Sequence, residues 1–179
     1  SVPLGSFWQV NPPVADQLLK TVAAWAEPLA VENLIDAYSG VGTFSIALSR
    51  PFRERILIES DRPAGDAASL NLAARAYGCR IIKDTTEHAL PKTLKTTSPK
   101  QTLVVLDPPR AGCQEKVLQT LLKALPEHIF FISCNPSTLA RDLKKLCGGE
   151  KYHLEKLALF DMFPRTAHFE TAVHLARQR

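Results

Sequence analysis

Short apolar segments alternate with amphipathic segments along most of this chain. Apolar runs that end at turn residues predict strands over residues 33–38, 55–59, 80–83, 103–106 and 130–133. Between them, apolar residues at helical spacing predict helices over residues 12–26, 43–48, 61–77, 114–125 and 136–146. Such an alternation is typical of a three-layer α/β fold, with a mostly parallel sheet between two layers of helices.

The end of the chain departs from this alternation. Residues 152–160 and 169–175 both read as strands, and no helical segment separates them. Two consecutive strands predict an antiparallel hairpin that closes a seven-stranded sheet. The polar residues 91–101 are predicted to form a surface connection. Gly78 is predicted to end the helix over residues 61–77. At 179 residues, we expect the whole chain to form a single domain.

Composition excludes several classes of protein. No apolar run approaches the length of a membrane span. The four cysteines form no Cys-x-x-Cys pair and the five histidines show no ligand spacing, so we expect neither a metal site nor a disulfide framework, and reduced thiols suggest the cytoplasm. Residues 91–179 hold 14 Lys and Arg against 8 Asp and Glu. That excess fits a polyanionic substrate, although scattered solvated lysines explain it nearly as well.

One cysteine stands where chemistry is expected. The apolar strand over 130–133 ends at Cys134, and Asn135-Pro136 then begins a helix. Open α/β sheets place their active sites where strands end and helices begin, and a helix N-terminus favours the thiolate form of a nearby cysteine. The alternative is a buried structural cysteine, and position alone does not separate the two.

A glycine-containing turn follows the first strand. Gly40 and Gly42 allow the backbone to turn tightly and to approach a ligand, but Ser45 stands where a dinucleotide-binding loop has its third glycine. Two glycines are therefore a weak signal, and an ordinary turn is the alternative. Glu59 lies at the end of the second strand, 17 residues after Gly42, where a carboxylate can accept both hydroxyls of a ribose.

Further charged residues lie at other strand ends. Asp84 follows the third strand, and Asp107 follows the fourth in a turn that Pro108 and Pro109 hold rigid and that ends in Arg110. These side chains are predicted to share one edge of the sheet with Cys134. Glu170 begins the last strand in apolar surroundings, which is costly for a carboxylate unless it is paired or functional. A salt bridge to Arg165 is the structural alternative.

Taken together, the motifs resemble those of the RNA uracil-5-methyltransferase family. The matching segments follow the family's order over nearly the whole chain: Phe7 to Asn11, Tyr38 to Phe44, Asp107 to Gly112, Ser133 to Asp142, and Asp161 to Pro164 with His168 and Glu170. Each motif alone is weak, and together they are specific. The resemblance implies a Rossmann-like class I methyltransferase fold that uses S-adenosylmethionine to methylate carbon 5 of a uridine in transfer or ribosomal RNA.

The resemblance also implies roles for individual residues. Cys134 would be the nucleophile that adds to carbon 6 of uracil, and Glu170 the base. The cofactor would be surrounded by Gln9, Tyr38, Gly40, Gly42, Thr43, Glu59, Asp84 and Asp107. Arg110 and Asn135 are further candidates that would contact the substrate and stabilise an enolate oxygen.

Longer members of this family carry an N-terminal RNA-binding barrel, and some carry an iron–sulphur cluster. Nothing of that kind is present here, so the chain is predicted to be the catalytic part of a longer protein. One alternative is a module that binds cofactor and RNA without turnover. Another is a methyltransferase acting on a different base, because an Asp-Pro-Pro turn also occurs in enzymes that methylate amino groups of adenine or guanine. A nicotinamide-dependent dehydrogenase is disfavoured by Ser45.

Overall fold

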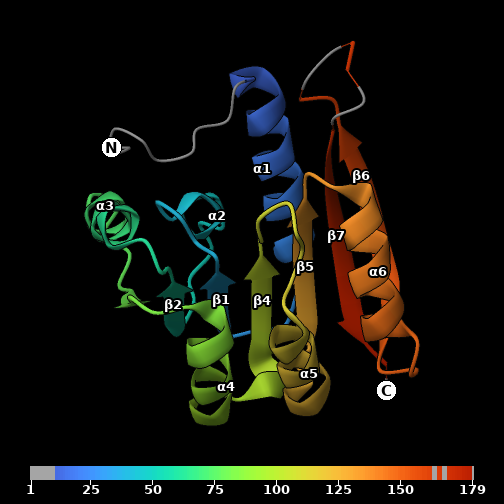
Figure 1. Ribbon diagram of the computed structural model, residues 1–179. Helices are drawn as coiled ribbons and strands as arrows, with labels where there is room; N and C mark the ends of the chain where they lie inside the picture. Colours follow the sequence, from blue (N-terminus) through green and yellow to red (C-terminus); the bar gives the residue numbers. More distant parts are fainter. Residues whose placement is uncertain (1–10, 163–164, 167–168, 179) are drawn as a thin grey trace.

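A computed structural model describes residues 11–162, 165–166 and 169–178. The described elements form one sheet with helices on both faces (Figure 1). In chain order they are α1 (Pro12–Ala26), β1 (Asn33–Ala37), α2 (Thr43–Ala47), β2 (Glu54–Ile58), α3 (Arg62–Ala73), β3 (Arg80–Ile82), α4 (Thr86–Thr96), a 3-10 turn (Pro99–Gln101), β4 (Thr102–Leu106), α5 (Glu115–Ala124), β5 (His128–Ser133), α6 (Pro136–Cys147), β6 (Tyr152–Phe160) and β7 (Glu170–Arg177).

The strand pairing confirms the predicted mostly parallel, seven-stranded sheet with a C-terminal hairpin. The seven-stranded sheet has the order β3-β2-β1-β4-β5-β7-β6, and its first five strands are parallel. β6 and β7 form the predicted antiparallel hairpin, in which β7 lies between β5 and the edge strand β6. Strands β2 and β3 extend the sheet on one side of β1, whereas β4 and β5 extend it on the other side. The topological switch point therefore lies at the carboxyl ends of β1 and β4.

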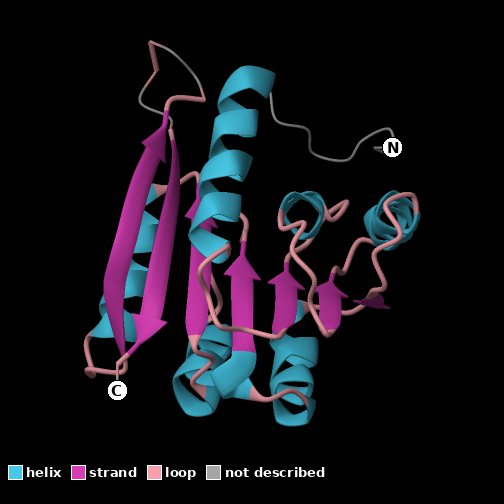
Figure 2. Cartoon of the chain, turned by 180° about the vertical axis from the view of Figure 1, so that it is seen from behind, coloured by secondary structure: helices cyan, strands magenta, loops and turns pink. Residues whose placement is uncertain are grey.

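Each face of the sheet packs against its own layer of helices. Alternate side chains of a strand point to opposite faces, so Val104 and Leu106 of β4 join the core under α4, α5 and α6, whereas Leu103 and Val105 join the core under α1 and α2. Helix α1 lies over the second face in Figure 2. This burial on both faces explains why residues 103–106 of β4 are all apolar.

Two local predictions were wrong. Residues 86–96 form α4 and include Pro91, so the predicted surface connection begins only after Thr96. The helix tolerates the proline because Leu90 and Leu94 are buried in the core, and packing outweighs one lost backbone hydrogen bond. α3 ends at Ala73 rather than near Gly78, because Leu72 is the last residue of the helix that reaches the core.

Candidate active site

The carboxyl ends of the parallel strands lie at one edge of the sheet. In Figure 1 the arrowheads of β1, β2, β4 and β5 all point to this edge, and the antiparallel β7 begins there. The structure therefore brings together the turns that follow Ala37, Ile58, Leu106 and Ser133 with the first residue of β7, Glu170. Loops at such a switch point are the usual place for a ligand in an open α/β sheet.

The glycine turn is held by the carboxylate that follows the next strand. Gly40 has a φ of 53° and donates its backbone N–H to Oε2 of Glu59 over 2.7 Å. The other oxygen of Glu59 accepts the N–H of Asp61 over 2.8 Å. A Cβ added at Gly40 would meet no heavy atom within 4 Å, so the side of the turn that this Cβ would occupy is open to a ligand.

Gly42, in contrast, is enclosed. Its φ is 83°, and an added Cβ would lie 2.8 Å from Cδ1 of Leu72 in α3. We expect Gly42→Ala to lower the free energy of unfolding by about 2–4 kcal/mol, because a left-handed backbone and an overpacked core act together. Denaturant unfolding measures this. Gly78→Ala is the matched control, with no neighbour within 4 Å and no positive φ, and equal losses in the two variants would contradict the explanation.

A pocket of about 440 Å³ opens beside this turn. Three of the predicted cofactor residues line it: Tyr38, Glu59 and Asp107. The sequence did not point to its other lining residues, which are Ile58, Ser60, Thr85, Thr86, Glu87, Pro109 and Gln114. The Tyr38 hydroxyl donates a hydrogen bond to Oε1 of Glu87 over 3.2 Å. Because the two residues are 49 positions apart, no local sequence pattern predicts this contact.

The other predicted cofactor residues that the structure describes do not line this pocket. Asp84 is partly buried and accepts the N–H of Thr85, which does line the pocket. Thr43 is exposed at the start of α2, directly after the glycine turn. Gln9 lies outside the described residues. The cluster thus offers carboxylates and an aromatic ring around a cavity of cofactor size.

Cys134 and Glu170 lie at adjacent strand ends. Ser133 of β5 pairs with Thr171 of β7, so Cys134 and Glu170 are the next residues along the two antiparallel strands. Cys134 is partly buried and unbridged, and it directly precedes the N-cap of α6. The register therefore places a thiol beside a carboxylate although the two residues are 36 positions apart in the sequence.

Glu170 is buried, and its pKa is raised to about 7 by that burial, while the nearby Arg110 opposes the shift. Its pKa therefore lies in the range in which a carboxyl group can serve as a base near neutral pH. The structural alternative for Glu170 fails, because the described part of the chain contains no ion pair between Glu170 and Arg165.

A second buried carboxylate lies behind the glycine turn. Oδ2 of Asp36 accepts both the N–H of Ser45, over 3.0 Å, and its hydroxyl, over 2.6 Å. This bond explains why a serine replaces the third glycine of the dinucleotide fingerprint. Burial raises the pKa of Asp36 to about 7, and burial together with repulsion from Glu170 and Asp36 raises the pKa of Asp107 to about 8.

Asn135 has a structural role that the sequence did not predict. Its side-chain oxygen accepts the N–H of Ser137 and caps α6, and its amide nitrogen donates to the carbonyl of Arg110 over 3.1 Å. An amide nitrogen carries two N–H groups, so one remains for a substrate. Arg110 is exposed beside the site.

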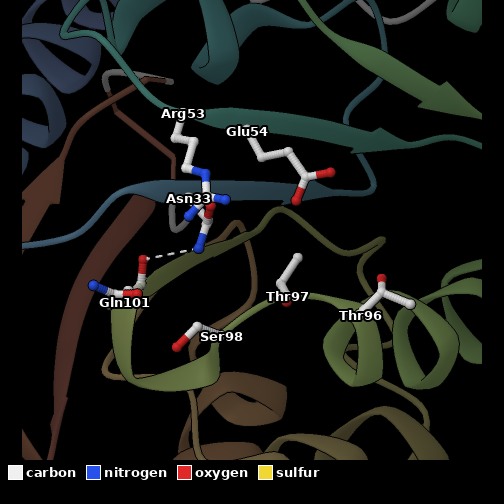
Figure 3. A pocket seen from close by; sticks show the side chains of 7 residues that line it. All are labelled: Asn33, Arg53, Glu54, Thr96, Thr97, Ser98 and Gln101. Carbon is white, nitrogen blue, oxygen red and sulfur yellow. Dashed lines mark hydrogen bonds between the residues drawn. The ribbon is translucent and has the colours of Figure 1, made fainter.

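A second pocket, of about 380 Å³, lies at the opposite edge of the sheet (Figure 3). Asn33 begins β1 and Glu54 begins β2, so this pocket is at the amino ends of the strands. None of the predicted site residues lines it.

In residues 11–162, 165–166 and 169–178 no group of His, Cys, Asp and Glu is arranged to hold a metal ion. None of the helices in these ranges is long and apolar enough to cross a membrane.

Comparison with known proteins decides the family. A sequence model of the tRNA (Uracil-5-)-methyltransferase family matches residues 2–178. The chain belongs to this family. An uncharacterized RNA methyltransferase of Thermosynechococcus vestitus is 37% identical over 167 residues, which are 93% of this chain and 36% of the relative. A similar relative from Gloeobacter violaceus is 38% identical over 175 residues, which are 96% of this chain and 36% of the relative.

Solved structures agree with the family and with the fold. The tRNA (uracil-54, C5)-methyltransferase of Pyrococcus abyssi, in complex with S-adenosyl-L-homocysteine, superposes with a TM-score of 0.79 at 32% identity over 96% of this chain and 40% of that protein. A putative methyltransferase of Escherichia coli superposes with a TM-score of 0.69 at 21% identity, over 99% of this chain and 91% of its own, which shows the shared class I methyltransferase fold. The chain thus spans about two fifths or less of the length of its family relatives.

Proposed function

We propose that this domain transfers the methyl group of S-adenosylmethionine to carbon 5 of a uridine in RNA. The observation that carries the proposal is the register of β5 and β7, which sets Cys134 beside Glu170 at the edge where the 440 Å³ pocket opens. Membership of the family indicates uracil as the nucleobase and RNA as the polymer that is methylated. The neighbouring thiol and carboxylate are the two groups that this reaction needs.

The residues around the pocket fit an adenosine-containing cofactor. Glu59 would accept the ribose hydroxyls, the open side of Gly40 would face the amino acid portion, and Tyr38 and Asp107 would complete the wall. The S-adenosyl-L-homocysteine bound to the Pyrococcus relative supports this assignment. When bound, S-adenosylmethionine supplies an electrophilic methyl group.

Cys134 would activate the uracil ring. Carbon 5 of uracil is a weak nucleophile, so the Cys134 thiolate adds to carbon 6, a carbon–sulfur bond forms, and the electron pair moves to the ring as an enolate. Carbon 5 of the enolate is then nucleophilic. Covalent catalysis of this kind divides one difficult step into easier ones. Arg110, whose positive charge lowers the pKa of Glu170, would stabilise the enolate oxygen.

Glu170 would complete the reaction. After carbon 5 has been methylated, its proton must leave before the carbon–sulfur bond can break. The Glu170 carboxylate accepts this proton, the electron pair restores the double bond between carbons 5 and 6, and the Cys134 thiolate departs. A base with a pKa of about 7 is well matched to this transfer near neutral pH.

The substrate uridine must leave its base stack to reach Cys134. Because the relatives are more than twice as long as this chain, we infer that another part of the same protein selects the RNA and the position. To test the proposed function, RNA is incubated with the protein and S-adenosylmethionine, digested, and searched for 5-methyluridine by mass spectrometry. A methyl group found on adenine, guanine or cytosine instead would contradict the proposal.

The release step should depend on pH. The Glu170 carboxyl must be ionised to accept a proton, so the rate of adduct breakdown should rise as pH increases and level off above the pKa, with a midpoint near pH 7. Arg110 lowers the pKa of Glu170, so Arg110→Gln should move this midpoint to higher pH. Lys116→Gln, which removes an exposed charge on α5, is the control. A midpoint that Arg110→Gln does not move would contradict this role of Glu170.

A further inference from the structure

The turn that follows β4 is fastened to helix α6 by side chains of that helix. The carbonyl of Arg110 accepts hydrogen bonds from Nδ2 of Asn135, over 3.1 Å, and from Oγ1 of Thr138, over 3.2 Å. Nη2 of Arg141 donates to the carbonyl of Ala111 over 3.0 Å. Three side chains of the segment that begins beside Cys134 thus bind the backbone of the turn that carries Arg110.

Asp142 lies at the centre of these contacts. It is wholly buried, and its Oδ2 accepts the backbone N–H of Cys113 over 2.8 Å. Its Oδ1 accepts Nε of Arg141 over 2.8 Å and lies 2.8 Å from Nη2 of the same guanidinium. A buried carboxylate that satisfies both oxygens with N–H donors is stable and fixes the direction of each donor.

The fit between turn and helix is close. Gly112 has a φ of 78°, and an added Cβ would lie 2.6 Å from Nη2 of Arg141 and 2.6 Å from Oδ2 of Asp142. The glycine therefore allows the turn to lie directly on the ion pair. Because α6 begins one residue after Asn135, the same helix sets the position of Cys134 and that of the turn.

We propose that Asp142 is a positioning residue for methyl transfer: with Arg141 it fixes the turn over residues 110–113 to α6, and so holds Arg110 in register with Cys134 and Glu170. The inference rests on the proposed function. Arg110 is the group through which Asp142 acts, since it contributes positive charge beside Glu170 and the enolate, while its backbone is tied to α6.

Asp142→Asn is the sharpest test. The two side chains have the same shape, but an amide presents an N–H₂ group where one carboxylate oxygen accepted a donor. That group would face either the N–H of Cys113 or the guanidinium of Arg141, so one side of the contact must open. The shift moves Arg110 relative to Cys134, and a misplacement of about 1 Å can lower a catalytic rate about 100-fold.

The measurement is the rate at which the protein forms a covalent adduct with RNA that contains 5-fluorouridine, in the presence of S-adenosylmethionine. For Asp142→Asn we expect the maximal rate to fall about 100-fold. The affinity for S-adenosylhomocysteine and the RNA concentration at half-maximal rate should both stay within about threefold, because interactions lost only in the transition state lower the maximal rate. Asp16→Asn makes the same change at an exposed site on α1 and should leave the rate unaltered.

Two results would overturn the proposal. One is an unchanged maximal rate in Asp142→Asn, and the other is a rate that falls only in parallel with cofactor affinity and thermal stability, as a general structural defect would produce. If Asp142→Asn does not fold, Thr138→Val decides: loss of its bond to the Arg110 carbonyl should slow the reaction about 3- to 10-fold, and an unchanged rate refutes the role. Absence of any adduct with the unaltered protein would instead refute the proposed function, and this role with it.

Discussion

Cys134→Ala should abolish methylation of RNA while cofactor binding stays within about threefold of that of the unaltered protein. The thiolate is the group that makes carbon 5 of uracil nucleophilic. The other described cysteine that follows a strand at this edge, Cys113, is buried, and burial raises the pKa of its thiol. Loss of an essential nucleophile typically lowers turnover by several orders of magnitude, so we expect a fall of at least about 1,000-fold. Transfer of a labelled methyl group measures turnover, and calorimetric titration with S-adenosylhomocysteine measures binding.

Cys147→Ala is the matched control for this prediction. It removes a partly buried, unbridged thiol from the far end of the same helix, α6, and should leave turnover within a few-fold of normal. If Cys134→Ala retained the turnover of the control, Cys134 would have no role as nucleophile. The alternative, a structural cysteine, would then be correct.

Glu170→Gln should trap the reaction after methylation. An amide cannot accept the carbon 5 proton, so elimination of Cys134 should slow by about 100- to 10,000-fold, the range typical of a lost general base. The covalent protein–RNA complex should therefore accumulate in this variant and survive on a denaturing gel. Formation of the adduct depends on Cys134 and should continue.

Glu155→Gln controls for the loss of a glutamate charge near the hairpin. Glu155 is exposed on β6, the strand paired with β7, and this variant should turn over normally without accumulating adduct. A Glu170→Gln variant that turns over as fast as the control would show that another group removes the proton.

The sequence predicted the mostly parallel sheet and its C-terminal hairpin, for a physical reason. Strands buried on both faces are largely apolar, so their ends are visible as the points where residues such as Glu59, Asp107 and Cys134 follow. The parallel arrangement then brings those ends to one edge. Glu170 attracted attention because burying a carboxylate at the start of an apolar strand costs free energy unless the group is paired or functional.

Features that depend on tertiary contacts were less visible in the sequence. α4 was misread because Pro91 argues against a helix, and only the core beneath Leu90 and Leu94 overrides it. The bond between Asp36 and Ser45 and that between Tyr38 and Glu87 join residues whose meeting depends on the packed sheet. The contact between Asp142 and the N–H of Cys113, 29 positions apart, belongs to the same class.

Attack of Cys134 on a uracil can be observed directly with RNA that contains 5-fluorouridine. Fluorine replaces the proton that Glu170 must remove, so the reaction should stop as a covalent complex. RNA with 5-fluorouridine is incubated with the protein and S-adenosylmethionine, and the product is read by intact mass and peptide mapping. We expect a mass increase equal to the methylated RNA fragment, located on Cys134. An adduct on another residue, or methylation of another base without any adduct, would contradict it.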